Sequence, residues 1–201
     1  MISDLNRASR GQKPTGVKLP PGRRVGVTFV SSLTGRRVPL RGALTRPATI
    51  SCINRLLFLV AQDRHDPILV EINAQGGSWF ESLWFIQTMD RVACPVPTFC
   101  SGPVADAAVI IAAHGQRGCR VAAPEAQFRF SPGATPENAT ESVRNSNARQ
   151  ELIGVLAQDT GKPPAEIARW LEAGATFTAQ QALELGLIDL VSPKPVFPSK
   201  A

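Results

Sequence analysis

The chain has 201 residues, 43% of them hydrophobic, and this length suits one α/β domain with a real core better than two domains. Its longest apolar run, residues 104–113, is too short to span a bilayer, and the N-terminus lacks the apolar middle of a secretory signal. We therefore expect a soluble protein with no membrane partner.

The net charge is +6, and the excess lies near the N-terminus, where the lysines and arginines between Arg7 and Arg46 are accompanied only by Asp4. Residues 1–24 are polar and rich in Pro, Gly, Lys and Arg, which predicts a disordered or partner-ordered arm. No aromatic residue interleaves these charges before Phe29, and no nucleic-acid-binding module is visible. We therefore expect no nucleic-acid partner and interpret the arm as one that docks on partner subunits or has no specific role.

From residue 25 to residue 191, short β-rich runs alternate with helical runs. The predicted strands cover residues 25–30, 68–73, 96–100, 127–130 and 187–191. The predicted helices cover residues 47–63, 78–91, 104–114, 136–159, 164–172 and 179–185. This alternation predicts one α/β domain of right-handed βαβ units, with a largely parallel sheet covered by helices. The proline-rich tail, residues 192–201, is predicted to be extended or disordered.

Capping residues support two of these helices. Ser78 with Glu81, and Thr178 with Gln181, have the spacing of a capping box, and Gly186 suits the left-handed position after the second helix. The first of these helices also carries an aromatic cluster. Its members are Trp79, Phe80, Trp84 and Phe85. Because they spread over more than one side of the helix, we predict that part of the cluster forms a partner interface.

The cysteines and histidines do not suggest a metal or cofactor site. The cysteines are Cys52, Cys94, Cys100 and Cys119, and the two histidines are His65 and His114. Their spacings match no zinc pattern, so we expect buried thiols in a reducing compartment, no metal and no cofactor.

Two strand-to-helix turns carry glycine. The first is the strand from Ile68 into Gly76-Gly77, where a helix starts at Ser78. Glycines let the backbone turn sharply, and amides at such a turn can point at an oxygen that becomes anionic. An ordinary tight turn is the plainer interpretation of this motif alone. The second turn follows Cys100 at Gly102 and leads into an alanine-rich helix with Asp106 in its first turn, a position that the helix dipole favours without any catalytic role.

The order of these motifs resembles the ClpP family, the proteolytic subunits of Clp proteases. The resemblance covers about residues 37–191 and includes Arg41-Gly42, the run from Leu56 to Leu59, both glycine turns and the ending at residues 177–189. It implies a ClpP/crotonase-like α/β fold: ββα-type repeated units, a mostly parallel sheet covered by helices, and a helical handle at about residues 131–160.

The family's catalytic positions, carried over onto this sequence, hold no intact triad. The nucleophilic serine lies four residues after the second glycine turn, where this chain has Asp106. Phe130 takes the place of the catalytic histidine, and the aspartate position falls at about Gly174. A serine nucleophile needs a base within hydrogen-bond reach and a group that orients the base. His65 and His114 are interpreted as exposed or helix-end histidines, so we expect no peptidase activity.

The resemblance also implies an oxyanion hole formed by the amides of Gly77 and Ala107. Asp106 would sit beside it. At about 4 Å and an effective dielectric constant near 20, a carboxylate would repel the oxyanion by roughly 4 kcal/mol. The substitution therefore removes the nucleophile and also opposes stabilisation of the transition state.

These departures are similar to those of ClpR, the non-catalytic subunits of cyanobacterial and plastid Clp proteases. The resemblance implies partners of two kinds: catalytically active ClpP-type subunits in a heptameric or mixed ring, and an AAA+ Clp unfoldase. It implies a cytoplasmic location, or alternatively the plastid stroma. The handle segment is a few residues shorter than in the family and contains Pro132 and Pro136, which affects ring-to-ring stacking more than ring formation.

Two other functions remain open. The chain could be a crotonase-superfamily acyl-CoA enzyme in which Asp106 acts as a general acid or base. It could also be a free-standing homomeric scaffold or binding module, because a fold alone does not define a function.

Overall fold

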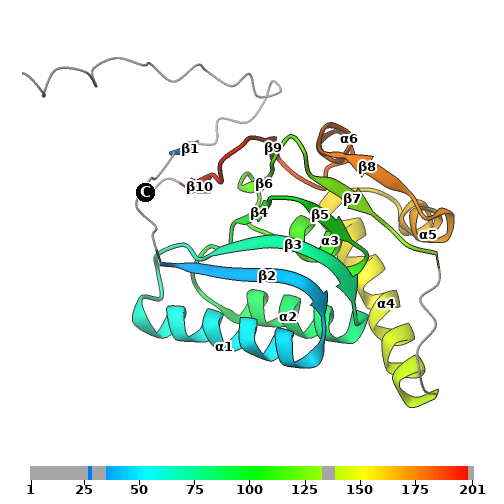
Figure 1. Cartoon of the computed structure of the whole chain (residues 1–201), viewed down its shortest axis with the longest axis horizontal. Coiled ribbons are helices and arrows are strands. Elements are labelled where there is room, and N and C mark those ends of the chain that lie inside the picture. The colour runs from blue at the N-terminus through cyan, green and yellow to red at the C-terminus, as the bar shows by residue number, and fades with distance from the viewer. Residues whose placement is uncertain (1–26, 29–34, 133–138, 199–201) are drawn as a thin grey trace, which may run out of the picture.

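The structure is a computed structural model that describes residues 27–28, 35–132 and 139–198. Its centre is a five-stranded sheet in which every neighbouring pair of strands is parallel (Figure 1). In spatial order the strands are β2 (Arg37–Leu44), β3 (Leu69–Gly77), β4 (Thr98–Cys100), β6 (Arg120–Ala122) and β9 (Leu190–Val191). Strand β2 is therefore one edge of the sheet.

Helices flank the central sheet. They are α1 (Arg46–Gln62), α2 (Trp79–Arg91), α3 (Ala107–Ala113), α4 (Ala139–Thr160), α5 (Pro164–Ala173) and α6 (Ala179–Glu184). Helix α1 packs on β2 and α3 packs on β3, while the long helix α4 contacts α2, α3 and α5 (Figure 1). The mixed α/β architecture with a mostly parallel sheet confirms the predicted fold class.

A smaller sheet stands beside the central one. It consists of β5 (Pro103–Ala105), β7 (Gln127–Arg129) and β8 (Thr176–Thr178), with β5 parallel and β8 antiparallel to β7. The helix predicted from residue 104 begins three residues later, at Ala107, because Pro103–Ala105 pair with β7 instead. This pairing creates a short strand that leads directly into α3.

The core explains why the central strands form. Val38 and Leu40 of β2 and Val70 and Ile72 of β3 are essentially inaccessible to solvent, as expected for parallel strands covered by helices. Every residue of α3 is buried as well, and its alanines allow the helix to lie close to the sheet. Strands β2 and β6 were not predicted as strands. In β2, exposed arginines alternate with the buried residues, which weakens the apolar signal.

The two ends of the described chain meet. Strand β1 (Val27–Thr28) pairs antiparallel with β10 (Phe197–Pro198), so two residues of the strand predicted at 25–30 are seen to pair. The arm at residues 1–24 lies outside the described residues, as do residues 133–138, where the long helix was predicted to begin. Within the described part of the tail, Val196 and Phe197 are buried against Phe99 and Val121, so apolar side chains between the prolines add to the core.

The aromatic cluster of α2 is more enclosed than predicted. Trp79 and Phe85 are buried, and Phe80 and Trp84 are partly buried against the core, because α1, α3 and α4 surround α2. The cluster is therefore less exposed than predicted, and a partner contact through its partly exposed members, Phe80 and Trp84, stays a prediction. Among the described residues, the exposed large hydrophobic side chains are Ile50, Leu57, Phe58 and Val143.

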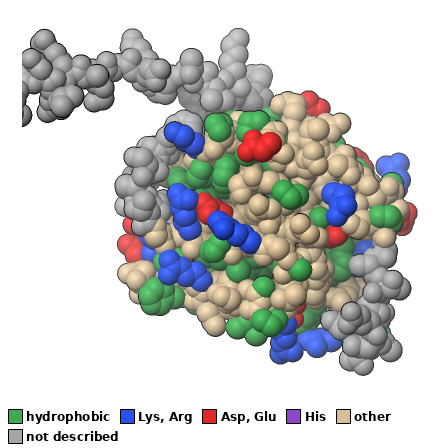
Figure 2. Space-filling model, viewed as in Figure 1, with side chains coloured by type: hydrophobic (Ala, Val, Ile, Leu, Met, Phe, Trp, Pro, Cys, Tyr) green, Lys and Arg blue, Asp and Glu red, His purple; other side chains and the backbone are tan. Residues whose placement is uncertain are grey.

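The visible surface is mixed in character. Figure 2 shows hydrophobic side chains scattered among charged ones, with basic side chains gathered on the side of the molecule where β2 begins. A shallow hollow between β2 and α1 is lined by Arg37, Arg41 and Arg55 together with Glu71. None of the helices in the described parts of the chain is long and apolar enough to cross a membrane.

Candidate functional site

Asp106 occupies a sharp turn between β5 and α3. Its φ is 51° and its ψ is −124°. In the described part of the chain, it is the only residue other than glycine with a positive φ. Its N–H donates to the Arg129 carbonyl at 2.8 Å, which ties the turn to β7. A non-glycine residue in such a region costs on the order of 1–3 kcal/mol and persists where the surrounding structure enforces it. Strained strand-to-helix turns of this kind are where serine hydrolases expose their nucleophile.

The glycine pair of the first turn lies directly beside Asp106. Gly76 has a φ of 92°, and a Cβ added to it would come within 2.7 Å of Asp106 Oδ2. Gly77 has a φ of 141°, and its Cβ would lie 2.6 Å from both the backbone nitrogen and oxygen of Leu44. Both positions therefore require glycine. The structure thus places Gly76 and Gly77 of the predicted oxyanion turn beside the elbow that precedes Ala107.

The Asp106 carboxylate makes a specific contact of its own. Its Oδ1 accepts a hydrogen bond from the Ser131 N–H at 2.6 Å. A carboxylate that accepts a backbone N–H forms a charge-assisted bond, stronger than a bond between neutral groups. Asp106 therefore connects the elbow to the chain that follows β7, where the predicted handle begins.

Phe130, which the sequence predicts at the position of the catalytic histidine, belongs to an aromatic cluster. Its ring is 1% exposed and lies 6.4 Å from the Trp170 ring in a stacked arrangement and 6.5 Å from the Phe177 ring edge to face. Trp170 and Phe177 meet edge to face at 5.3 Å. We name these three residues the aromatic plug. It offers no proton acceptor at the place where a catalytic base would stand.

Gly174, which the sequence predicts near the position of the catalytic aspartate, is the C-cap of α5. Its φ is 64°, in the left-handed region, and a Cβ there would lie 2.9 Å from Pro132 Cδ. The next residue, Ala175, accepts a hydrogen bond from the Phe130 N–H at 2.8 Å. The three positions predicted to correspond to a triad, Asp106, Phe130 and Gly174, therefore all lie around the carboxyl end of β7. They come together in space, and their side chains are a carboxylate, a phenyl ring and a hydrogen.

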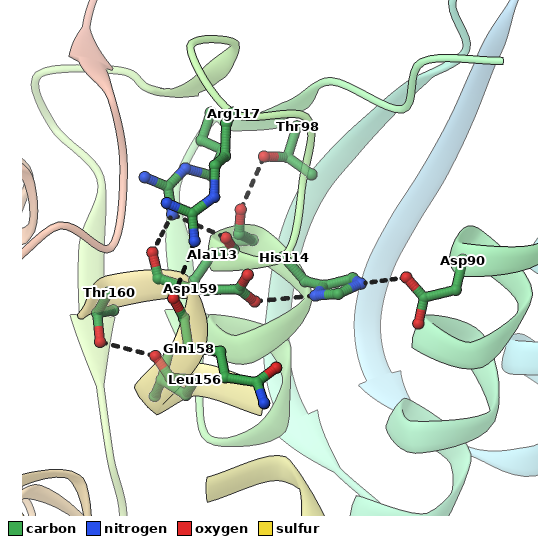
Figure 3. A network of polar contacts seen from close by, with 11 residues as sticks. Asp90, Thr98, Ala113, His114, Arg117, Leu156, Gln158, Asp159 and Thr160 are labelled. Carbon is green, nitrogen blue, oxygen red and sulfur yellow. Dashed lines mark hydrogen bonds and ion pairs between the residues drawn. The ribbon is translucent and has the colours of Figure 1, made fainter. Parts of the chain in front are cut away.

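The two histidines lie elsewhere. His65 is exposed in the connection between α1 and β3. His114 follows the last residue of α3 and contacts Asp90 and Asp159 rather than Asp106 (Figure 3). In the described part of the chain, no three His, Cys, Asp or Glu side chains gather where they could hold a metal ion.

Sequence reasoning missed one residue that shapes the glycine turn. Asn145 of α4 accepts hydrogen bonds through Oδ1 from Ser78 Oγ at 3.0 Å and from the Phe80 N–H at 3.1 Å. Ser78 Oγ also accepts from the Glu81 N–H at 3.3 Å, which is one of the two bonds of the predicted capping box. The Ser78 N–H donates to the Leu44 carbonyl. Helix α4 thus helps to hold the start of α2, and no local signal marks Asn145 because it lies 67 residues from Ser78.

The strained elbow, the glycine pair beside it and the mostly parallel sheet define a class of protein, an α/β protein built on the plan of a serine peptidase. The comparison with known families agrees. A family model described as Clp protease matches residues 23–195, and the chain belongs to the Clp protease family. Proteins of the ClpP family generally form oligomeric rings with other Clp subunits.

Proposed function

We propose that this chain is a non-catalytic, ClpR-like subunit of an ATP-dependent Clp protease complex. The observation that carries the proposal is the pairing of two substitutions around the end of β7. The elbow holds the Asp106 carboxylate, and the base position holds Phe130 inside the aromatic plug. Triad members act as a unit, so loss of both the nucleophile and the base removes the reaction that the class performs.

The geometry of the elbow supports the same conclusion. Asp106 Oδ2 lies close to the backbone of Gly76, on the turn whose amides the family uses for an oxyanion. A negative charge developing there would meet a negative charge already in place. The repulsion, roughly 4 kcal/mol at about 4 Å with a dielectric constant near 20, corresponds to a loss of about three orders of magnitude in rate.

A ring role is supported by the outer surface of α1. Leu57 and Phe58 are 47% and 54% exposed, and the Arg55 guanidinium lies 5.8 Å from the centre of the Phe58 ring. Exposed large apolar side chains next to basic ones are typical of partner interfaces. We therefore assign to this surface, rather than to the aromatic residues of α2, the contact with neighbouring ClpP-type subunits in a heptameric or mixed ring. An AAA+ Clp unfoldase is the second proposed partner, and the cytoplasm, or alternatively the plastid stroma, is the proposed location.

The chemical half of the proposal is tested with the purified chain and its Asp106→Ser variant. Neither should cleave fluorogenic peptides or react with a fluorophosphonate probe, because restoring the hydroxyl leaves the base absent. A catalytically intact ClpP subunit is the positive control. Stoichiometric labelling of Ser101 or Ser131 in the unmodified chain would contradict the proposal, and cleavage by the variant would show that another base reaches the elbow.

The assembly half is tested by native mass spectrometry with an intact ClpP-type subunit present. Phe58→Ser should reduce incorporation into rings, whereas Val143→Ser, at an equally exposed apolar residue on α4, is the matched control and should not. A chain that remains monomeric alone and with every Clp subunit would favour the isolated binding module. Calorimetric binding of acyl-CoA would instead favour the crotonase-type enzyme.

A further inference from the structure

A second cluster of polar side chains, far along the chain from the elbow, joins three helices. His114 is the residue after α3, and its backbone N–H donates to the Ile110 carbonyl. Its ring nitrogen Nδ1 lies 2.8 Å from Asp159 Oδ2 of α4, and Nε2 lies 2.9 Å from Asp90 Oδ1 of α2 (Figure 3). We call these three side chains the His114 latch.

The hydrogen-bond inventory of imidazole constrains the protonation of this ring. A neutral imidazole has one N–H donor and one nitrogen acceptor, whereas the imidazolium form has two donors. Both partners of His114 are carboxylates, which accept hydrogen bonds when they are ionised. Both contacts can therefore be hydrogen bonds only when the ring carries a proton on each nitrogen. A cation at the carboxyl end of a helix is also favoured by the exposed carbonyl dipoles.

The other charged groups near the latch also favour a protonated ring, because the nearby arginines are paired or directed at backbone carbonyls. Arg120 of β6 donates to the Ala113 carbonyl at 2.9 Å and to the Asp159 carbonyl at 3.3 Å. Its charge is matched by Asp189, which it meets at 2.7 Å. Arg117 donates to the Gln158 carbonyl at 2.8 Å and is directed at the backbone of α4. Asp90 and Asp159 are the charges that contact the ring itself.

Burial alone would lower the pKa of His114. The hydrogen bonds and charges of Asp159 and Asp90 outweigh it, so the pKa lies above the ordinary histidine value. A raised pKa in the folded state means that the latch stabilises the fold fully below about pH 6.5, the ordinary histidine value, and that this stability is lost as the pH rises through the folded value. The pH window in which the latch weakens therefore lies above about 6.5.

We propose that His114 is a proton-dependent latch that ties α2 to α4 through the end of α3, and that loss of its proton releases the α2 side first. The two partners differ in a way that sets this order. The Asp159 side chain is 16% exposed, and the Asp90 side chain is 61% exposed. A neutral ring keeps a single donor, and the more buried carboxylate loses more when left without one. The neutral ring therefore keeps its hydrogen bond to Asp159 and loses the one to Asp90.

Among the described residues, other polar contacts between α2 and α4 lie at the start and in the middle of α2. Asn145 accepts from Ser78 and Phe80 at the start of α2, and Gln87 Nε2 donates to Glu151 Oε1 at 3.5 Å in its middle. The latch is the contact at the end of α2. Its opening would loosen that end of α2 from α4 while leaving the elbow side tied. This inference holds whether or not the chain joins a ring.

The first test measures the protonation of His114 directly. A His65→Gln variant leaves His114 as the chain's single histidine, so ring signals in a ¹H–¹³C spectrum report on it alone. We expect its titration midpoint to lie above about 6.5. The midpoint should fall in both Asp90→Asn and Asp159→Asn, and it should fall further in Asp159→Asn. A midpoint at or below about 6.5, or one that neither variant lowers, would overturn the proposal.

The second test measures whether protonation of His114 controls the local stability at the end of α2. Hydrogen exchange of the full chain, corrected for the intrinsic effect of pH on amide exchange, should show the end of α2 losing protection severalfold between about pH 6 and about pH 9. In His114→Gln, which has no titrating ring, protection there should be lower throughout and should not change with pH. An equal loss in the unmodified chain and in His114→Gln would show that the latch does not act. If that variant fails to fold, Asp90→Asn supplies the same comparison, because it removes only the exposed partner.

Discussion

The elbow and the aromatic plug lie side by side around the end of β7, yet the two regions are built in opposite ways. At the elbow the backbone keeps the strained turn and the close glycine pair, and only the side chain of Asp106 differs. At the plug the predicted base position is filled with packed rings, and Phe130 is 1% exposed. One region is therefore a strained backbone turn, and the other is packed core.

This difference indicates what holds each region in place. The elbow is set by strand pairing and by backbone contacts, since Asp106 donates to Arg129 and a Cβ on Gly77 would strike the backbone of Leu44. The plug is set by side-chain packing between Phe130, Trp170 and Phe177. Substitutions should therefore act on the two regions through different physical effects, and their sizes can be compared.

The largest effect is expected at the plug. Phe130→Ala should lower the free energy of unfolding by about 3–5 kcal/mol, because it removes a fully buried ring and leaves a cavity between two other aromatic side chains. Chemical denaturation measures the change. Phe58→Ala, at a ring that is 54% exposed, is the matched control and should cost less than about 1 kcal/mol. Equal costs at the two positions would show that the plug is not a packed core.

A smaller effect is expected when a methyl group is added at one glycine of the pair. Gly77→Ala should cost about 1–2 kcal/mol for its left-handed backbone and about 1–3 kcal/mol more for the clash with Leu44. Gly35 has a similar φ of 134°, but nothing lies within 4 Å of its added Cβ, so Gly35→Ala isolates the backbone cost. The thermal unfolding midpoint should fall further in Gly77→Ala. If the two variants unfold alike, the close approach of the turn to β2 is not what requires glycine.

The sequence predicted the fold class and most helices because their signals are local. The Thr178 and Gln181 capping box forms as predicted, with the Gln181 N–H donating to Thr178 Oγ1 and the Thr178 N–H donating to Gln181 Oε1. Strand β6 was missed, since it begins with the charged Arg120, whose partner Asp189 lies 69 residues away in the sequence. The burial of Trp79 and Phe85 within the α2 aromatic cluster was not predicted, because the sequence does not show that three helices would surround α2.

The candidate site likewise contains features that local motifs predict and features that they do not. The glycine turns and the positions of Asp106 and Phe130 follow from motifs, each contained within a few residues. The contacts that these residues make do not follow, since Asp106 meets Ser131 25 residues away and His114 meets Asp159 45 residues away. Such pairs depend on how helices and strands assemble, and neither residue carries a signal for its partner. The strain at Asp106 was equally hidden, because it arises from the pairing of β5 with β7.

The smallest expected effect concerns the backbone strain at Asp106. Asp106→Gly and Asp106→Ala both remove the hydrogen bond from the Ser131 N–H, so the difference between them reports mainly on the backbone. At an unstrained position alanine is the more stable of the two, by about 0.4–1 kcal/mol, because glycine has more freedom in the unfolded chain. At a φ of 51° and ψ of −124°, alanine would carry a strain of about 1–3 kcal/mol that glycine avoids. We therefore expect the order to reverse, with the glycine variant more stable by about 1 kcal/mol in chemical denaturation. The same pair of substitutions at Glu125, an exposed turn residue without a positive φ, is the control and should favour alanine. If alanine is favoured at both positions, the elbow is relaxed, and the shape retained there owes nothing to stored strain.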